Sequence, residues 1–157
     1  YKGYIRSSIL RFKFYGARHY APAYGRLLAM RIRQEYADEF DVITWVPISR
    51  LRRLTRGYDQ VELLAEAVGK ELGMEPVRLL KKIRNTPPQS GIPDAPRRRA
   101  NVLGVYVPCP DARIKEKRIL LVDDVATSGS TLSACAKVLA QAGAEEVWCV
   151  TLAQAGN

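Results

Sequence analysis

The sequence predicts an α/β fold in which a mostly parallel central sheet is flanked by helices. Strand-like and helical patterns alternate along the 157 residues, as in chains that join parallel strands by helical crossovers. Ile119–Val122 is an unbroken apolar run, typical of a strand that is buried on both faces. A strand, a helix and a second strand follow one another between residues 41 and 80, an order that implies a right-handed parallel crossover.

In the first half of the chain, glycine and proline mark the ends of the expected helices. Gly16 and Gly73 suit helix C-termini, and Pro22 suits a first helical turn. The expected elements are helices over 1–16, 21–37 and 58–72 and a strand over 41–46. The expected apolar stripes are Tyr24, Leu27, Leu28, Ile32 and Tyr36 in the second helix and Val61, Leu64, Ala65, Val68 and Leu72 in the third.

The second half of the chain alternates strands with one helix. Strands are expected over 76–80, 102–107, 118–122 and 146–152, and the apolar helical face comprises Leu132, Cys135, Val138, Leu139 and Ala142. Residues 81–101 differ in character, because they hold four prolines, one glycine and six basic residues. Such a segment predicts a flexible basic loop that acts as a lid, with a disordered basic linker as the alternative.

Composition and charge narrow the class of protein. The hydrophobic content of 47% and charged content of 26% are ordinary for a soluble globular domain, and no signal peptide or membrane span is recognisable, so no membrane insertion is expected. Cys135 and Cys149 fall in core-like patterns and predict buried thiols in a reducing cytoplasm, whereas Cys109 lies between two prolines. The net charge of +9 indicates an anionic partner, either a small anion or a nucleic acid.

The most informative stretch follows the apolar run directly. Asp123 and Asp124 come first, and Thr127–Thr131 then leads into the last helical pattern. A helix N-terminus with hydroxyl donors and a glycine suits a phosphate, whereas two adjacent carboxylates suit a ribose diol or a hydrated Mg²⁺. Together these features predict a ribose-5-phosphate site. The alternative is an acid and several hydroxyl residues that do no more than cap the helix.

This stretch resembles the phosphoribosyl pyrophosphate (PRPP) motif of type I phosphoribosyltransferases. Further motifs make nearly the whole chain similar to the ComF competence-protein family, also described as amidophosphoribosyltransferase-like. They are Lys13–Gly16, Val46–Pro47, Arg56–Gln60, Gln89 and Arg98–Asn101. Many ComF proteins carry an N-terminal zinc-binding cysteine module. No counterpart is present in this chain, which we take as one domain over 1–157 and which begins at Tyr1, as a trimmed N-terminus would.

The resemblance implies a role for each motif. Asp123 and Asp124 are the expected catalytic residues and would hold the Mg²⁺ cofactor, indirectly. The 5′-phosphate would bind Ala126, Thr127, Ser128, Gly129, Ser130 and Thr131, and the pyrophosphate would bind Ile48, Ser49, Arg50 and Arg56 in the loop after the first strand. Gln89, Arg98 and Asn101 would belong to the flexible loop that closes over PRPP. Family members more often have Asn at Asp59, which here could cap the following helix.

Two functions compete on these grounds. The first is an enzyme that binds Mg-PRPP and transfers the phosphoribosyl group to a nitrogen acceptor with release of pyrophosphate. The second is a DNA-uptake factor on the same scaffold, whose basic stretches 50–56, 81–84 and 97–99 bind single-stranded DNA. A third combines them, with PRPP regulating assembly. Other competence proteins are further candidate partners, self-association into a homo-oligomer is left open, and a cytoplasmic location is expected.

Overall fold

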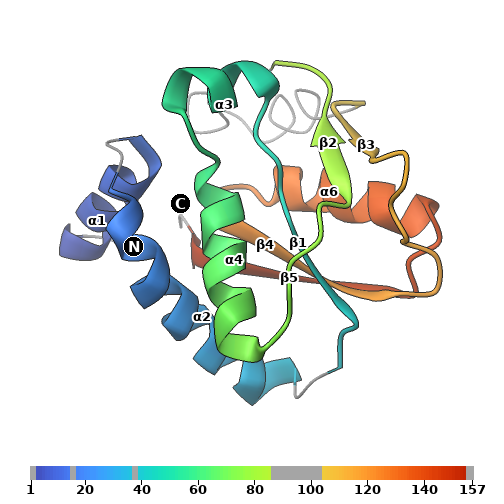
Figure 1. Ribbon diagram of the computed structural model, residues 1–157, viewed down its shortest axis with the longest axis horizontal. Helices are drawn as coiled ribbons and strands as arrows, with labels where there is room; N and C mark the ends of the chain where they lie inside the picture. The colour runs from blue at the N-terminus through green and yellow to red at the C-terminus, as the bar shows by residue number, and fades with distance from the viewer. Residues whose placement is uncertain (1–2, 15–16, 37–38, 86–103, 155–157) are drawn as a thin grey trace.

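The computed structural model describes residues 3–14, 17–36, 39–85 and 104–154, except for the side chains of 3–6 and 13–14. Helices come first along the chain, and strands and helices are interspersed from residue 42 onward (Figure 1). The helices are α1 (Gly3–Phe14), the short 3-10 helix η1 (Arg18–Tyr20), α2 (Ala21–Tyr36), α3 (Arg50–Arg56), α4 (Gln60–Leu72) and α6 (Ser130–Gln141). The strands are β1 (Val42–Trp45), β2 (Leu80–Lys82), β3 (Tyr106–Pro108), β4 (Arg118–Ala126) and β5 (Glu146–Gln154).

The main sheet is parallel and has the strand order β1-β4-β5, which confirms the expected α/β class. Val42 pairs with Ile119 and Leu121 with Cys149, so β4 is the central strand. Its residues 119–122 are fully buried, as the apolar run predicts. The start of the β1–β4 pair is fixed by Arg118, whose guanidinium lies 2.9 Å from an Asp41 carboxylate oxygen and lowers the pKa of that carboxyl to about 2.

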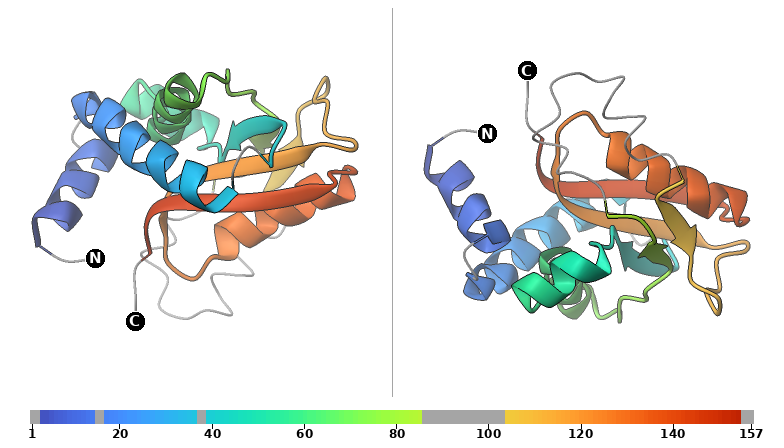
Figure 2. Two further views of the ribbon diagram at one scale, coloured as in Figure 1. Left: turned by 90° about the horizontal axis from the view of Figure 1, so that it is seen from below. Right: turned by 90° about the horizontal axis from the view of Figure 1, so that it is seen from above.

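Helices cover the two faces of the sheet (Figure 2). Helices α2 and α4 pack together on one face, where Phe12, Ile32, Leu64 and Leu120 belong to one buried cluster. Helix α6 covers the other face, where Leu121 and Leu139 belong to a second cluster. The buried faces of α4 and α6 follow the predicted stripes, and Gly73, at φ 71°, ends α4 as expected.

The expected loop after the first strand is wrong in part, because residues 50–56 form α3. Ser49 is its N-cap and accepts the backbone N–H of Arg52 at 3.4 Å, and Gly57 ends it with a left-handed φ of 75°. The sequence RLRRLTR has no apolar stripe long enough to predict a helix by periodicity. The caps and tertiary contacts stabilise this short helix instead.

The expected crossover from the first strand to a parallel strand over 76–80 is also wrong. Val77 donates its backbone N–H to Ile43, so the segment does begin beside β1. Two residues later, the backbone N–H of Leu79 donates to the hydroxyl of buried Thr44 at 3.3 Å rather than to the backbone of β1. No regular ladder forms there. Strand β2 begins at Leu80 and pairs antiparallel with β3. Lys81 and Lys82 therefore lie in a strand and not in the expected loop.

Two residues expected in the core are exposed. Leu27 is 55% exposed, because Gly25, Leu28, Ala29 and Ile32 supply the buried face of α2 and Leu27 lies beside that face. Cys149 is exposed on β5, which pairs only with β4 among the described strands, whereas Cys135 is buried as expected. None of the described helices combines the length and apolar character needed to cross a membrane.

Candidate functional site

The centre of the candidate site is the pair of carboxylates in the last part of β4. Asp123 and Asp124 are only 7% and 3% exposed. Asp123 accepts the backbone N–H of Asp124 at 2.8 Å, and Asp124 accepts that of Val125 at 2.7 Å. These contacts fix the rotation of each carboxyl group about its own backbone. Two oriented, buried carboxylates at the end of a parallel strand form a recognition surface for hydroxyl groups or a cation.

The hydroxyl-rich loop leads from β4 into α6. Gly129 precedes the helix at φ 71°, a conformation that favours glycine. No side chain at this N-cap position accepts the first backbone N–H groups of the helix. The Ser128 and Ser130 hydroxyls lie 2.7 Å apart, and Ser128 Oγ also accepts the N–H of Ser130 at 3.4 Å. Helix N-termini carry N–H groups without intrahelical partners and a positive dipole end. Ala126–Thr131 therefore lies where an anion would meet the first turn of α6.

The second predicted anion-binding segment follows β1 and is held to the start of α4. The Ile48 N–H donates to Asp59 at 3.2 Å, and Asp59 also accepts the N–H groups of Val61 and Glu62 as the N-cap of α4. Asp59 therefore does cap the helix, and burial raises the pKa of its carboxyl. Ser49 donates its hydroxyl to Asn85 at 3.0 Å, and Arg50 is exposed.

Gln60 connects this segment to the carboxylates. Its side-chain oxygen accepts a hydrogen bond from Arg56 at 3.1 Å, and its side-chain nitrogen donates to Asp124 at 3.2 Å. Gln60 is 2% exposed. The structure thus brings predicted residues from two distant segments, Arg56 and Asp124, to opposite ends of one amide. Sequence reasoning placed Gln60 in a family motif and gave it no role.

Known proteins of similar sequence show which family carries this site. A sequence model described as phosphoribosyl transferase domain matches residues 63–157, which include both carboxylates and the hydroxyl-rich loop. The chain belongs to this family. Competence protein F of Haemophilus influenzae is 31% identical over 94% of this chain and 66% of its own length. DNA utilization protein YhgH of Escherichia coli O157:H7 is 28% identical over 90% of this chain and 64% of its own length.

These relatives confirm the resemblance to the ComF branch of the phosphoribosyl transferase family. The chain spans less than two thirds of the length of the curated relatives it matches, from 48% to 66%. Among solved structures, the glutamine PRPP amidotransferase of B. subtilis, complexed with ADP and GMP, matches with a TM-score of 0.58. That match has 25% identity over 86% of this chain and 26% of the other. The type I phosphoribosyltransferase fold is therefore confirmed.

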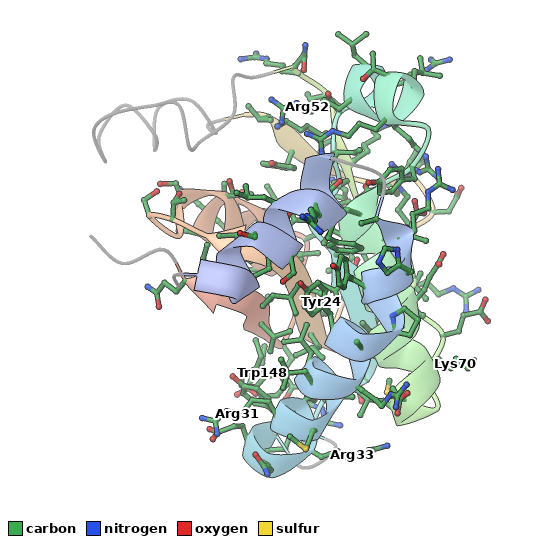
Figure 3. All side chains as sticks on the ribbon, turned by 90° about the vertical axis from the view of Figure 1, so that its left-hand side faces the viewer. Tyr24, Arg31, Arg33, Arg52, Lys70 and Trp148 are labelled. Carbon is green, nitrogen blue, oxygen red and sulfur yellow. The ribbon has the colours of Figure 1, made fainter. Side chains whose placement is uncertain are left out.

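Two cations, Lys82 and Arg52, lie near the motif Asp123–Thr131 and were not predicted as part of the site. Lys82 on β2 lies over the ring of its β3 partner Tyr106, 5.5 Å from the centroid. The Tyr106 side chain in turn lies near Thr131 at the start of α6. Arg52 of α3 lies at this end of the molecule, far from Arg31 and Arg33 on α2 (Figure 3). In the sequence, 81–84 is a single basic run, and no local signal distinguishes Lys82 from the exposed Lys81.

The electrostatics of Lys82 follow from this position. Burial, and then repulsion from Arg52, lowers the pKa of Lys82 to about 8, against weaker attraction from Cys135 and Asp123. No ion pair to Lys82 is found among the described residues, which place it beside Arg52 and near Asp123. A partly buried cation in this setting favours an incoming anion.

We expect Lys82→Met to change how stability depends on pH. Unfolded Lys82 keeps its proton up to about pH 10.5 and folded Lys82 only up to about 8, so the folded state is penalised fully below pH 8. As pH rises from 8 to 10.5 this penalty is relieved. Its relief raises the free energy of unfolding by about 1–2 kcal/mol after allowance for solvent screening. Desolvation raises the pKa of the buried Cys135 thiol, and that of the Cys149 thiol to about 11, which lowers stability above about pH 9 in all the proteins compared. Urea unfolding should therefore show wild type becoming more stable relative to Lys82→Met by this amount from pH 7.5 to pH 10. Exposed Lys81→Met should keep the wild-type difference, and equal behaviour of the two variants would contradict the expectation.

The remaining predicted residues cannot be placed. Gln89, Arg98 and Asn101, and with them the expected lid over most of 81–101, lie outside the described residues. Their roles stay predictions.

Proposed function

We propose that this domain binds Mg-PRPP across the carboxyl ends of β1 and β4. The observation that carries the proposal is the link from Arg56 through Gln60 to Asp124, which joins the cationic segment after β1 to the carboxylates of β4. PRPP has an anionic pyrophosphate and a ribose diol on adjacent carbons of one ring. A site for it needs cations and carboxylates within one ligand's length of each other.

Each part of the ligand has a counterpart in the site. The 5′-phosphate would occupy the loop Ala126–Thr131 at the start of α6, and the diol would hydrogen-bond Asp123 and Asp124. The pyrophosphate would lie toward Ser49, Arg50 and Arg56. The Ile48 N–H already donates to Asp59, so its contact with pyrophosphate would require that bond to be exchanged or shared. Lys82 near Asp123 and Arg52 beside Lys82 add further positive charge to the site.

The donors fit magnesium only when substrate supplies much of the coordination. Among the described residues there is no group of three or more His, Cys, Asp or Glu side chains that could hold a metal ion. Mg²⁺ usually keeps several waters and binds one or two carboxylates together with substrate phosphates. Asp123 and Asp124 meet that requirement through water or the diol. Mg²⁺ bound in this way would supply charge stabilisation for the pyrophosphate.

In the proposed reaction, a nitrogen nucleophile attacks C1 of the ribose. A carbon–nitrogen bond forms as the bond from C1 to the pyrophosphate oxygen breaks, and pyrophosphate leaves with the bonding electron pair. Arg56 and Arg52 would stabilise the departing charge, and the two aspartates would hold the ring through its hydroxyls.

Calorimetric titration of the protein with Mg-PRPP tests the proposal. Mg-pyrophosphate and ribose 5-phosphate are the comparison ligands, because each contains one half of PRPP. We expect saturable binding of PRPP that is tighter than that of either half, since both halves of the site are then occupied at once. An absence of heat at about 1 mM PRPP, which corresponds to roughly −4 kcal/mol of binding free energy, would overturn it.

A second candidate function, binding of single-stranded DNA, is favoured by the exposed surface of α3 and β2. Arg50, Lys81 and Arg84 are exposed there, and Leu51 and Leu54 are 55% and 71% exposed. The name of the Escherichia coli relative refers to DNA utilization. Basic side chains interspersed with apolar ones suit a sugar–phosphate backbone with unstacked bases.

Anisotropy titrations of a labelled oligothymidylate at several salt concentrations would test this second function. The Arg50→Gln/Lys81→Gln variant should lose affinity and lower the slope of log K against log salt by roughly 0.7 for each phosphate that the protein no longer neutralises. Arg31→Gln/Lys70→Gln removes the same charge from the distant end of the molecule (Figure 3) and is the control. An equal fall in affinity in the two variants would show that only net charge matters and would exclude a defined surface on α3 and β2.

A further inference from the structure

The junction of α3 and α4 places a buried amide between a cation and an acid. Arg56 is the last residue of α3, Gly57 turns the chain with φ 75°, and Gln60 is the first residue of α4. The turn returns the chain so that the side chains of Arg56 and Gln60 meet at 3.1 Å. At 2% exposure, Gln60 is shielded from competing water.

The chemistry of the amide matches both neighbours. Its oxygen accepts from the Arg56 guanidinium, and its nitrogen donates to the Asp124 carboxylate at 3.2 Å. Glutamate at position 60 could accept from Arg56, but its carboxylate would then face Asp124. Leucine of similar volume could do neither. These two partners require a neutral group that carries one acceptor and one donor.

The bond to Asp124 also determines how that carboxylate is presented. One Asp124 oxygen accepts the Val125 N–H at 2.7 Å, and the other accepts from Gln60. Two donors on different oxygens define the plane of a carboxylate. Because Arg56 holds the opposite end of the amide, the orientation of the Asp124 carboxylate depends on where Arg56 lies.

We propose that Gln60 is a positioning residue that couples the pyrophosphate side of the site, through Arg56, to the diol side, through Asp124. The inference rests on the proposed function, since the two sides take their meaning from PRPP. Arg56 held by pyrophosphate fixes the Gln60 amide, and the amide fixes Asp124 for the ribose hydroxyls. Loss of the amide uncouples the two sides without removing a group that contacts the ligand.

Three variants separate this role from simple packing. Gln60→Glu keeps the acceptor for Arg56 and replaces the donor to Asp124 with a like charge. Gln60→Leu removes both hydrogen bonds at similar volume. In Gln60→Glu/Asp124→Asn, the asparagine amide can donate to the new glutamate, so the pair is restored with its polarity reversed. Gln34→Glu, at an exposed position of α2, is the matched chemical control.

Calorimetry with Mg-PRPP, Mg-pyrophosphate and ribose 5-phosphate, together with thermal melting of each variant, forms the experiment. Gln60→Glu should weaken PRPP and ribose 5-phosphate by roughly ten- to a hundredfold, the range expected for loss of a hydrogen bond to a buried charge. The affinity of Gln60→Leu for Mg-pyrophosphate should stay within about twofold of wild type, because leucine adds no charge beside Arg56. The melting temperature should fall in Gln60→Glu and recover in Gln60→Glu/Asp124→Asn, and Gln34→Glu should change none of these values.

The other outcomes overturn one idea or the other. Wild-type protein that binds no PRPP overturns the proposed function and this inference with it. Wild-type protein that binds PRPP, with Gln60→Glu and Gln60→Leu binding equally well, overturns the inference alone. Equal weakening of all three ligands in step with a lower melting temperature also overturns it, because Gln60 would then act only through packing.

Discussion

The Asp123→Asn/Asp124→Asn variant is expected to lose at least about a hundredfold in affinity for Mg-PRPP, because both the charge that attracts the cation and the acceptors for the diol are reduced. Asparagine has nearly the same shape as aspartate and keeps one carbonyl oxygen. The backbone N–H groups of Asp124 and Val125, which donate to the two side chains at 2.8 and 2.7 Å, can therefore keep their acceptors. The protein should stay folded while the site stops working.

Calorimetry measures the affinity, and thermal melting reports whether the variant is folded. Asp111→Asn/Glu145→Gln makes the same change in net charge at two exposed positions outside the site and should bind PRPP like wild type. Undiminished binding by the Asp123→Asn/Asp124→Asn protein would mean that the carboxylates are not where PRPP binds. Loss of binding in the control as well would point to net charge as the cause.

Gly25→Val is expected to lower the free energy of unfolding by more than about 3 kcal/mol, because α2 and α4 meet there without room for a side chain. A β-carbon at Gly25 would lie 2.5 Å from that of Ala67 and 2.7 Å from its carbonyl carbon. The second contact is with backbone, so the helices themselves would have to separate. Gly25→Ala should cost roughly 1–3 kcal/mol by the same contacts, less about 1 kcal/mol gained from the helix propensity of alanine.

Urea unfolding would measure these changes. Adding Ala67→Gly to Gly25→Ala removes the 2.5 Å contact and leaves the backbone contact, so it should restore stability only in part. Ala23→Val, on the exposed side of α2, tests the effect of a branched residue in the same helix and should cost less than about 1 kcal/mol. Gly25→Val and Ala23→Val variants of equal stability would show that the helices can separate at little cost.

The local parts of the fold could be predicted because their signals are local. The buried strand was visible as the apolar run Ile119–Val122, and the apolar faces of α4 and α6 were visible at helical spacing. Gly73 and Asp59 mark the ends of α4 by their own conformational and capping preferences. The motif Asp123–Thr131 predicted both the strand-to-helix turn and the class of protein, which the family comparison confirmed.

The predictions of strand pairing, helix and burial that were wrong concern segments where tertiary contacts outweigh local preference. The segment 76–80 was expected to pair with the first strand, but Thr44 accepts the Leu79 N–H that would have continued a ladder with β1. The strand that forms, Leu80–Lys82, pairs with β3 instead. The seven residues of α3 are too few to carry a periodic signal, and the helix depends on its caps and neighbours. Leu27 and Cys149 are apolar in pattern but lie where no described element covers them.

The sequence by itself determined the carboxylate pair, the glycine turn into α6 and the family, since each depends on residues that are consecutive in the chain. Only the tertiary structure decided that Gln60, 64 residues before Asp124, joins that carboxylate to Arg56, and that Lys82 faces Tyr106 beside the motif. Hydrogen bonds between distant segments leave no period or spacing in the sequence, because they depend on how the packed elements bring backbone positions together. The chemistry of each residue is local, and the combination that makes a site is a property of the fold.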